Sequence, residues 1–354
     1  MWVFRSWALT AQLPAIGQLV AESPARWSGG AVSTLTIERR LSDGYLRAAL
    51  CRDAVEGLTA TPKRLRPVWF YDARGSALFE DITRLPEYYP SRAEREILAD
   101  RAREIAGSTL AGTLVDLGSG SSEKTRLLLA ALREAGSLAL YVPVDVSEAA
   151  LVGASEALRS DSPELAVHAV LADFGAQLSQ LPRDGRCLVA FLGSTIGNLP
   201  PAERAAFLAK VRAALLPGDA LLLGTDLVKD PAAMVAAYDD AAGVTAEFNL
   251  NVLRVLNREL GADFDLDGFT HVARWIAAEE WIEMRLRSRR RQVVTLPGVG
   301  LVVTFGPGEE MRTEISAKFR REGIRAELAA AGFPLTRWWT DRAGRFGLTL
   351  STVE

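Results

Sequence analysis

The chain of 354 residues carries a net charge of −3, and 49 % of its residues are hydrophobic and 24 % charged. A chain of this length and composition can bury a large core, and it suggests two domains or one domain with a sizeable insertion. The slightly acidic balance argues against nucleic acid or an anionic membrane as a partner, and the one basic cluster, at 285–291, alternates like the solvated face of a strand.

Residues 1–34 form an N-terminal extension that we expect to be poorly ordered. Its first part loosely imitates a signal peptide, but Gln12, Pro14 and Gln18 interrupt the apolar run, which is also too short to cross a bilayer. Because no other segment approaches a transmembrane helix, we expect a cytoplasmic protein that does not bind membranes.

The segment at 70–94, FYDARGSALFEDITRLPEYYPSRAE, holds three of the six tyrosines, Tyr71, Tyr88 and Tyr89. A core strand would not contain PEYYP, and a surface loop rarely keeps so many aromatic rings without something to cover. We therefore expect these rings to face a partner surface or a ligand.

From residue 110 onward, short apolar runs alternate with segments of helical periodicity, such as 123–136. Near-continuous apolar strands separated by helices indicate an α/β fold with a parallel sheet covered on both sides. Ligands of such sheets bind at the carboxyl ends of the strands. The five predicted strands are 113–117, 139–146, 166–174, 187–193 and 219–227.

After residue 228 the pattern changes to a helical region and then to alternating stretches with Gly/Pro turns, which are typical of antiparallel strands. We predict that 229–318 is an insertion that joins 35–91 in a second, α+β domain, whereas 92–228 and 319–354 form the first domain. The predicted elements are a helical region at 231–259, strands at 279–288, 291–298 and within 300–319, a helix at 321–333, and strands at 335–342 and 345–353.

The sequence VDLGSGSSEKT places Asp116, Gly118 and Gly120 at the turn after the first predicted strand. Glycines there let the backbone approach a ligand, and the following helix offers free N–H groups. Dinucleotide-binding and S-adenosylmethionine-binding enzymes both use such a turn. Two features favour the second class. Glu123 stands where the third glycine of a dinucleotide fingerprint belongs, and Asp116 would repel a pyrophosphate but meet the ammonium of a bound methionine moiety.

Two further acids end the next predicted strands. Asp145 ends the second, where a carboxylate can accept both ribose hydroxyls, and Asp173 with Phe174 ends the third, where the pair can bond and pack against an adenine. Each acid alone could be an exposed loop residue. Acids at three consecutive strand ends indicate a cofactor site.

No metal site or disulfide framework is predicted. The two histidines, His168 and His271, lie far apart in the sequence and match no ligand spacing. The two cysteines, Cys51 and Cys187, are too few for a disulfide framework and favour a reducing compartment.

Six longer motifs occur in a fixed order: WFYDARGSALFEDITRLPEYYPSRAEREIL, LGSGSSEKT, FLGSTIGNL, LLLGTDLVKD, AYDDAAGV and TEISAKF. With them the chain, over 35–354, resembles the S-adenosylmethionine-dependent histidine Nα-methyltransferase family of ergothioneine biosynthesis. The resemblance implies a Rossmann-like, seven-stranded methyltransferase sheet with an inserted substrate-binding domain. It also implies a monomer that uses S-adenosylmethionine without a metal and methylates L-histidine three times to give Nα,Nα,Nα-trimethylhistidine (hercynine).

The resemblance also implies a set of site residues. The family's cofactor contacts fall on Gly118, Lys124, Asp145, Asp173 and Phe174. Its histidine contacts fall on Tyr88, Asn198, Tyr238, Glu314 and Ser316. Four further positions line the family's substrate pocket, namely Tyr71, Phe79, Gly193 and Met284. Ser121 stands where many members have threonine, and the first 34 residues match nothing in the family's pattern.

The strand predicted for TEISAKF places Glu314 and Ser316 on one face and Ile315 on the other. A neutral imidazole can donate its N–H to the carboxylate and accept from the hydroxyl through its other nitrogen. Without the resemblance, a polar strand edge that faces solvent is the simpler interpretation. With it, the two residues become the pair that selects the side chain.

The remaining candidates have structural alternatives. Asn198 can bind the polar end of an amino acid or cap the next helix, and Tyr238 can donate to a carboxylate, as Tyr88 can, or simply pack. The family resemblance makes the tyrosine-rich segment a pocket wall, whose ring faces suit a sulfonium and a quaternary ammonium. Tyr71 is the candidate that helps a proton leave the amine, directly or through water.

Three other functions stay open on the sequence. The chain could methylate another amino acid or small amine, with Glu314 and Met284 as the positions that would retune the pocket. It could bind S-adenosylmethionine without turnover, or it could be a nicotinamide oxidoreductase, against which the missing third glycine and Asp116 both count.

Overall fold

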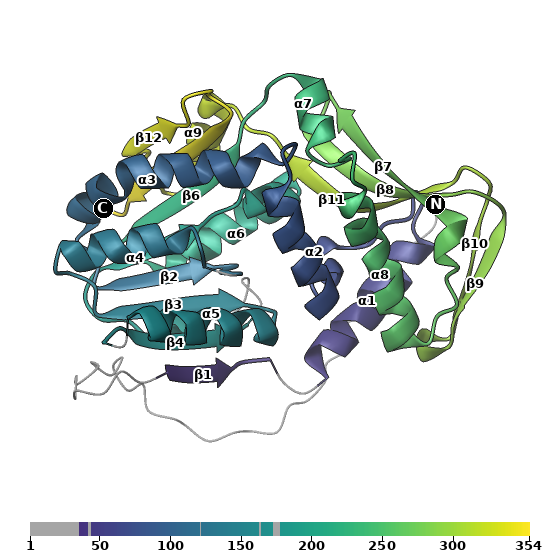
Figure 1. Ribbon diagram of the computed structural model, residues 1–354, viewed down its shortest axis with the longest axis horizontal. Helices are drawn as coiled ribbons and strands as arrows, with labels where there is room; N and C mark the ends of the chain where they lie inside the picture. Colours follow the sequence, from purple (N-terminus) through teal and green to yellow (C-terminus); the bar gives the residue numbers. More distant parts are fainter. Residues whose placement is uncertain (1–34, 42–43, 121, 163, 173–177) are drawn as a thin grey trace, which may run out of the picture.

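A computed structural model describes 35–41, 44–120, 122–162, 164–172 and 178–354. The predicted extension at 1–34 therefore lies outside the described residues. The described chain forms a large sheet flanked by helices and, beside it, a second unit of helices and smaller antiparallel sheets (Figure 1).

The large sheet has eight strands in the order β1-β4-β3-β2-β5-β6-β13-β12. The first six are parallel where they pair, and β13 runs antiparallel to both of its neighbours. All five predicted strands are confirmed as members of this sheet, as are the two terminal ones. The strands are β1 (Leu35–Arg39), β2 (Thr113–Leu117), β3 (Leu140–Asp145), β4 (Ala166–Leu171), β5 (Cys187–Phe191), β6 (Ala220–Asp226), β12 (Arg337–Thr340) and β13 (Phe346–Thr352).

The strand β1 is the eighth strand, added to the predicted seven. It pairs in parallel with β4, from Leu35 opposite Val167 to Arg39 opposite Leu171. The prediction placed this segment in the second domain, and here the structure corrects it. The physical reason is that β4 would otherwise present a row of unpaired backbone groups at the sheet edge, which β1 satisfies.

Helices cover both faces of this sheet, as predicted for strands that are buried throughout. Successive side chains point to opposite faces, so that Leu114 packs with the helices of one side and Val115 with those of the other. The helices on the first side are α3 (Tyr89–Thr109), α4 (Thr125–Glu134) and α5 (Glu148–Asp161), and those on the second are α6 (Pro201–Ala214) and α9 (Arg321–Ala330).

The second unit packs four helices against a three-stranded sheet of order β11-β8-β7 and a hairpin. Strand β7 was not predicted individually, and the helical region at 231–259 is divided in two. The break has a local cause, because the Asp240 carboxylate accepts the backbone N–H groups of Val244 and Thr245 and so starts a new helix. The elements are α1 (Tyr45–Thr59), α2 (Ala73–Arg84), α7 (Pro231–Ala236), α8 (Val244–Leu260), β7 (Phe269–Ile276), β8 (Trp281–Ser288), β9 (Gln292–Leu296), β10 (Leu301–Phe305) and β11 (Glu310–Ala317).

The two units meet where the inserted segment leaves and re-enters the large sheet. The backbone N–H of Phe319 donates to the carbonyl of Asp226 at 2.7 Å, and Val228 donates to Phe319 at 3.0 Å. These bonds hold the end of β11 at the carboxyl end of β6, between the two units (Figure 1). Polar side chains on β11 are thereby brought to the ligand-binding edge of the sheet.

Arg285 and Arg287 of the basic cluster lie on β8 and are half-buried, whereas the exposed residues at 289–291 follow the strand, so the predicted solvated strand face is only partly correct. Arg285 and Arg287 pair with Glu310 on the neighbouring strand, and Arg285 also pairs with Glu283. These arginines are therefore neutralised within the sheet.

Candidate active site

The glycine turn after β2 has the conformation that its sequence requires. Gly118 and Gly120 have φ angles of 72° and 49°, a region that favours glycine. A side chain at Gly120 would meet nothing within 4 Å, so the turn borders open space. The buried Ser119 hydroxyl finds no hydrogen-bond partner among the described residues. Open space beside an unpaired polar group fits a bound polar ligand.

Asp145 closes this turn from the end of β3. Its carboxylate accepts the backbone N–H of Gly120 at 3.1 Å and that of Ser147 at 2.9 Å. Burial raises its pKa, although these backbone hydrogen bonds oppose the rise. Each carboxylate oxygen has a further lone pair, so the group can still accept the two ribose hydroxyls for which it was predicted.

Asp116 lies deeper than its predicted role suggests. One of its oxygens accepts from the hydroxyls of Thr125, at 2.6 Å, and Tyr141, at 3.1 Å. Burial raises its pKa to about 6, against the effect of these two hydrogen bonds. Asp116 thus links the glycine turn to α4 through Thr125. Its contact with a methionine ammonium stays a prediction, and only the second carboxylate oxygen would be available for it.

Lys124 forms an ion pair with Glu94 of α3, a fully buried acid that the sequence did not single out. Both Glu94 oxygens also accept the backbone N–H of Gly193, each at 2.9 Å. One carboxylate therefore links a predicted cofactor contact to a predicted substrate contact. A detectable signal existed, because Glu94 lies on the apolar face of its helix, next to Ala93 and Leu98.

Asp173 and Phe174, the predicted adenine contacts, lie outside the described residues. They stay predictions based on the resemblance.

The rings that were predicted to form a pocket wall lie in one connected cluster, which we call the aromatic wall. Tyr71 contacts Phe79 edge-on, with ring centroids 5.6 Å apart, and Phe79 contacts Tyr88 at 6.1 Å. Tyr88 in turn lies 6.3 Å from Tyr238, which follows α7. Segments far apart in the sequence thus converge on one set of rings. Tyr89 differs from Tyr88, because its hydroxyl donates to the carboxylate of Asp226.

Glu314 faces this wall from β11. It is only 7 % exposed, and no described residue donates a hydrogen bond to its carboxylate. Burial raises its pKa to about 8, although the positive charge of Lys318 acts in the opposite direction. Its charge helps to raise the pKa of Tyr71 and of Tyr88, which shows that it lies near both. A buried acceptor without a donor is costly unless a ligand supplies one.

Ser316 lies two residues further along β11, as predicted, and its hydroxyl is 2.7 Å from that of Tyr238. The ammonium of Lys318 donates to both hydroxyls and pairs with Asp226 at 2.9 Å. Asp226 also accepts the hydroxyl of Tyr89. None of Tyr89, Asp226 and Lys318 was a predicted site residue, and together they support the predicted ones.

Two further predicted residues, Asn198 and Met284, adjoin the same place. Asn198 ends a short 3₁₀ helix, and it does not cap α6, whose N-cap is Pro200 without a side-chain bond. The preceding Gly197 lies so close to β11 that a side chain would come within 2.9 Å of the Ala317 carbonyl. Met284, on β8, is buried opposite Glu314.

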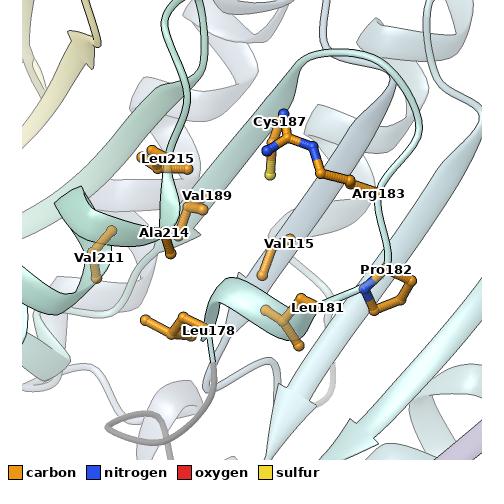
Figure 2. A pocket seen from close by; sticks show the side chains of 10 residues that line it. All are labelled: Val115, Leu178, Leu181, Pro182, Arg183, Cys187, Val189, Val211, Ala214 and Leu215. Atoms are coloured by element: carbon orange, nitrogen blue, oxygen red, sulfur yellow. The ribbon is translucent and has the colours of Figure 1, made fainter. Parts of the chain in front are cut away.

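A separate small cavity lies at the amino end of β5, away from these residues (Figure 2). Its lining is mainly aliphatic, with Arg183 and the buried Cys187 as its polar members. A volume of about 30 Å³ accommodates water rather than a substrate. Among the described residues, no group of His, Cys, Asp or Glu could hold a metal ion, and no helix could cross a membrane.

Comparison with known proteins gives consistent matches along the chain. A family model for histidine-specific, SAM-dependent methyltransferases matches residues 50–353. The histidine N-alpha-methyltransferase of Mycobacterium tuberculosis is 55 % identical over 317 residues, which cover 90 % of this chain and 99 % of that protein. That of Mycolicibacterium smegmatis is 56 % identical, with the same coverage. Ergothioneine biosynthesis protein 1 of Neurospora crassa is 32 % identical over 82 % of this chain and 33 % of its own length.

Proposed function

Because the chain belongs to the family of histidine-specific, SAM-dependent methyltransferases, we propose that it methylates the α-amino nitrogen of L-histidine three times. The product is Nα,Nα,Nα-trimethylhistidine, and the reaction is the first step of ergothioneine biosynthesis. We further propose that the protein acts as a monomer in the cytoplasm.

The unpaired Glu314 carboxylate is the observation that carries this proposal. A neutral imidazole supplies the missing donor through one ring N–H, and its other nitrogen accepts from the hydroxyl of Ser316. The two groups come from one face of β11 and are 7 % and 3 % exposed. An aliphatic or phenyl side chain would leave the Glu314 carboxylate without a donor, which supports histidine over other amino acids.

The other end of the substrate falls between the aromatic wall and the strand ends. We propose that Tyr88, Tyr238 and Asn198 bind the carboxylate and amine of the amino acid. Gly118, Lys124 and Asp145 are the residues we propose to hold S-adenosylmethionine, which supplies an electrophilic methyl group on a sulfonium. The protein's main contribution is alignment of the two reactants, which is worth up to roughly 7–11 kcal/mol in well-oriented systems.

The α-nitrogen must arrive without its extra proton and must lose a proton after each of the first two transfers. Burial, with nearby negative charge, raises the pKa of Tyr71 well above its ordinary value, so its phenol stays protonated. We therefore propose Tyr71 as a hydrogen-bonding relay to water rather than as a base that keeps the proton.

The test is mass spectrometry of the products formed from histidine and S-adenosylmethionine by the wild type and by Glu314→Ala. We expect gains of one, two and three methyl groups on the α-nitrogen. The variant should lose roughly 100-fold or more in kcat/KM for histidine, because it leaves an imidazole N–H unsatisfied. Methylation of a ring nitrogen, or undiminished activity of the variant, would overturn the assignment, and a panel of other amino acids and amines tests the alternative substrates.

A further inference from the structure

Lys318 is a fully buried cation directly beside the proposed substrate pocket. Its side chain is 0 % exposed, and its ammonium makes three polar contacts: with the carboxylate of Asp226 at 2.9 Å, the hydroxyl of Tyr238 at 2.9 Å and the hydroxyl of Ser316 at 2.8 Å. An ammonium has three N–H donors and no acceptor, so all three donors are used. Its position is fixed as well, because its backbone N–H donates to the carbonyl of Glu280 at 2.7 Å.

These contacts decide which way the two hydroxyl groups can act. A hydroxyl has one O–H donor and two acceptor lone pairs. Since Tyr238 and Ser316 each accept from Lys318, each keeps its own O–H to donate. They lie 2.7 Å apart, so one can donate to the other while no ligand is present. That arrangement still leaves one O–H, and a ligand with two acceptors can take both.

We propose that Lys318 is a positioning residue that fixes the hydrogen-bond polarity of the substrate pocket, by making donors of the Tyr238 and Ser316 hydroxyls opposite the acceptor Glu314. The inference rests on the proposed function and extends it. The Ser316 donor and the Glu314 acceptor are complementary to a neutral imidazole, which has one acceptor nitrogen and one N–H, and the Tyr238 O–H is left for the carboxylate of the amino acid.

The positive charge of Lys318 also favours the proposed polarity at Glu314, because it lowers the pKa of that carboxyl group. Among the residues that the structure describes, the titratable groups that face Glu314 are Tyr71, Tyr88, Tyr238 and Lys318, and the ammonium is the one cation in this set. It favours the ionised carboxylate, which can only accept. Loss of Lys318 would therefore weaken both halves of the pocket.

Lys229 offers a matched control. It is also a buried lysine, and its ammonium contacts the same Asp226 at 2.6 Å. Its other polar contacts are the hydroxyl of Tyr89 and a backbone carbonyl, so it touches neither of the two pocket hydroxyls. A variant at Lys229 disturbs the same buried carboxylate without changing the proposed polarity.

The experiment compares the wild type with Lys318→Met, Lys318→Gln and Lys229→Met. S-adenosylmethionine affinity, measured by calorimetry, reports that each variant is folded, and the KM for histidine is then measured from pH 6.5 to 9.5. We expect Lys318→Met to raise this KM roughly tenfold or more and to move the midpoint of its pH dependence upward by about one pH unit. S-adenosylmethionine affinity should stay within about twofold.

Lys318→Gln should recover part of the KM because its amide can donate, but it should keep the displaced midpoint because it carries no charge. If Lys318→Met does not bind S-adenosylmethionine, the inference is tested with Lys318→Gln alone, and a midpoint unchanged from the wild type would overturn it. An unchanged KM and midpoint, or an equal loss in Lys229→Met, would overturn the inference. Absence of histidine methylation by the wild type is a different result, which would refute the proposed function itself.

Discussion

Replacing Glu314 by glutamine should remove a pH-dependent loss of stability that the buried Glu314 carboxylate causes in the unliganded protein. The carboxylate is buried without a donor among the described residues, and burial raises its pKa from an ordinary 4.5 to about 8. An unfolded chain therefore loses this proton near pH 4.5, whereas the folded protein keeps it until about pH 8. The contribution of Glu314 to the free energy of unfolding is therefore fully present below pH 4.5, and it becomes progressively less favourable as the pH rises to about 8.

The size of the effect follows from the same two values. Each pH unit between them costs about 1.4 kcal/mol, so the complete loss is up to about 5 kcal/mol above pH 8. Glutamine has the same shape and no charge, so Glu314→Gln should lack this part of the pH dependence, whatever its stability at pH 5.

The assay is denaturant unfolding of the wild type and Glu314→Gln at pH 5 and pH 8.5 without ligands. The difference between the two proteins should shift by a few kcal/mol in favour of the variant as the pH rises. Glu283→Gln is the control, because Glu283 is equally buried but is bound by Arg285 and Arg312. Parallel pH dependences of the wild type and Glu314→Gln would refute the reasoning.

Two further predictions concern the cofactor side. Asp145→Asn should weaken S-adenosylmethionine binding by roughly 10–100-fold in calorimetry, because the amide keeps one acceptor oxygen and turns an N–H₂ toward donors, whereas the exposed Asp161→Asn should leave the affinity unchanged. Glu94→Gln should lower the free energy of unfolding by about 1–3 kcal/mol in denaturant titrations, because Lys124 loses its buried anion. A loss no larger than that of Glu104→Gln, on the exposed side of the same helix, would contradict the second prediction.

The large sheet was predictable because its strands are buried on both faces. The segment at 187–191 is a continuous apolar run, and 113–117 is buried throughout although it contains Thr113 and Asp116, as expected for strands covered on both faces. Strand β7 escaped individual prediction because most of its residues are only half-buried, so polar and apolar residues do not alternate cleanly. The five residues of β1 are held by pairing with β4, more than 120 positions away, which no local pattern encodes.

The site residues likewise differ in whether their roles could be predicted from the local sequence. Asp145 was predictable because a strand end is a local feature with a known geometric consequence. Asp226 also ends a strand, and Glu94 lies on the apolar face of its helix, but neither was singled out because the partners that give them a role are distant in the sequence. Lys318 carried an unused signal, because alternation along TEISAKF places it on the same face as Glu314 and Ser316.

Phenols around the proposed position of the reacting nitrogen suit the chemistry of repeated methylation. A carboxylate beside the amine would raise its pKa and hold the proton that must leave before the next transfer. Burial raises the pKa of Tyr71, Tyr88 and Tyr238 well above the ordinary value, so these groups stay neutral and do not act in this way. Their rings still attract the quaternary ammonium that forms at the end. In the proposed binding mode the acidic group, Glu314, lies at the imidazole end, where it accepts from the ring N–H without retaining the amine's proton.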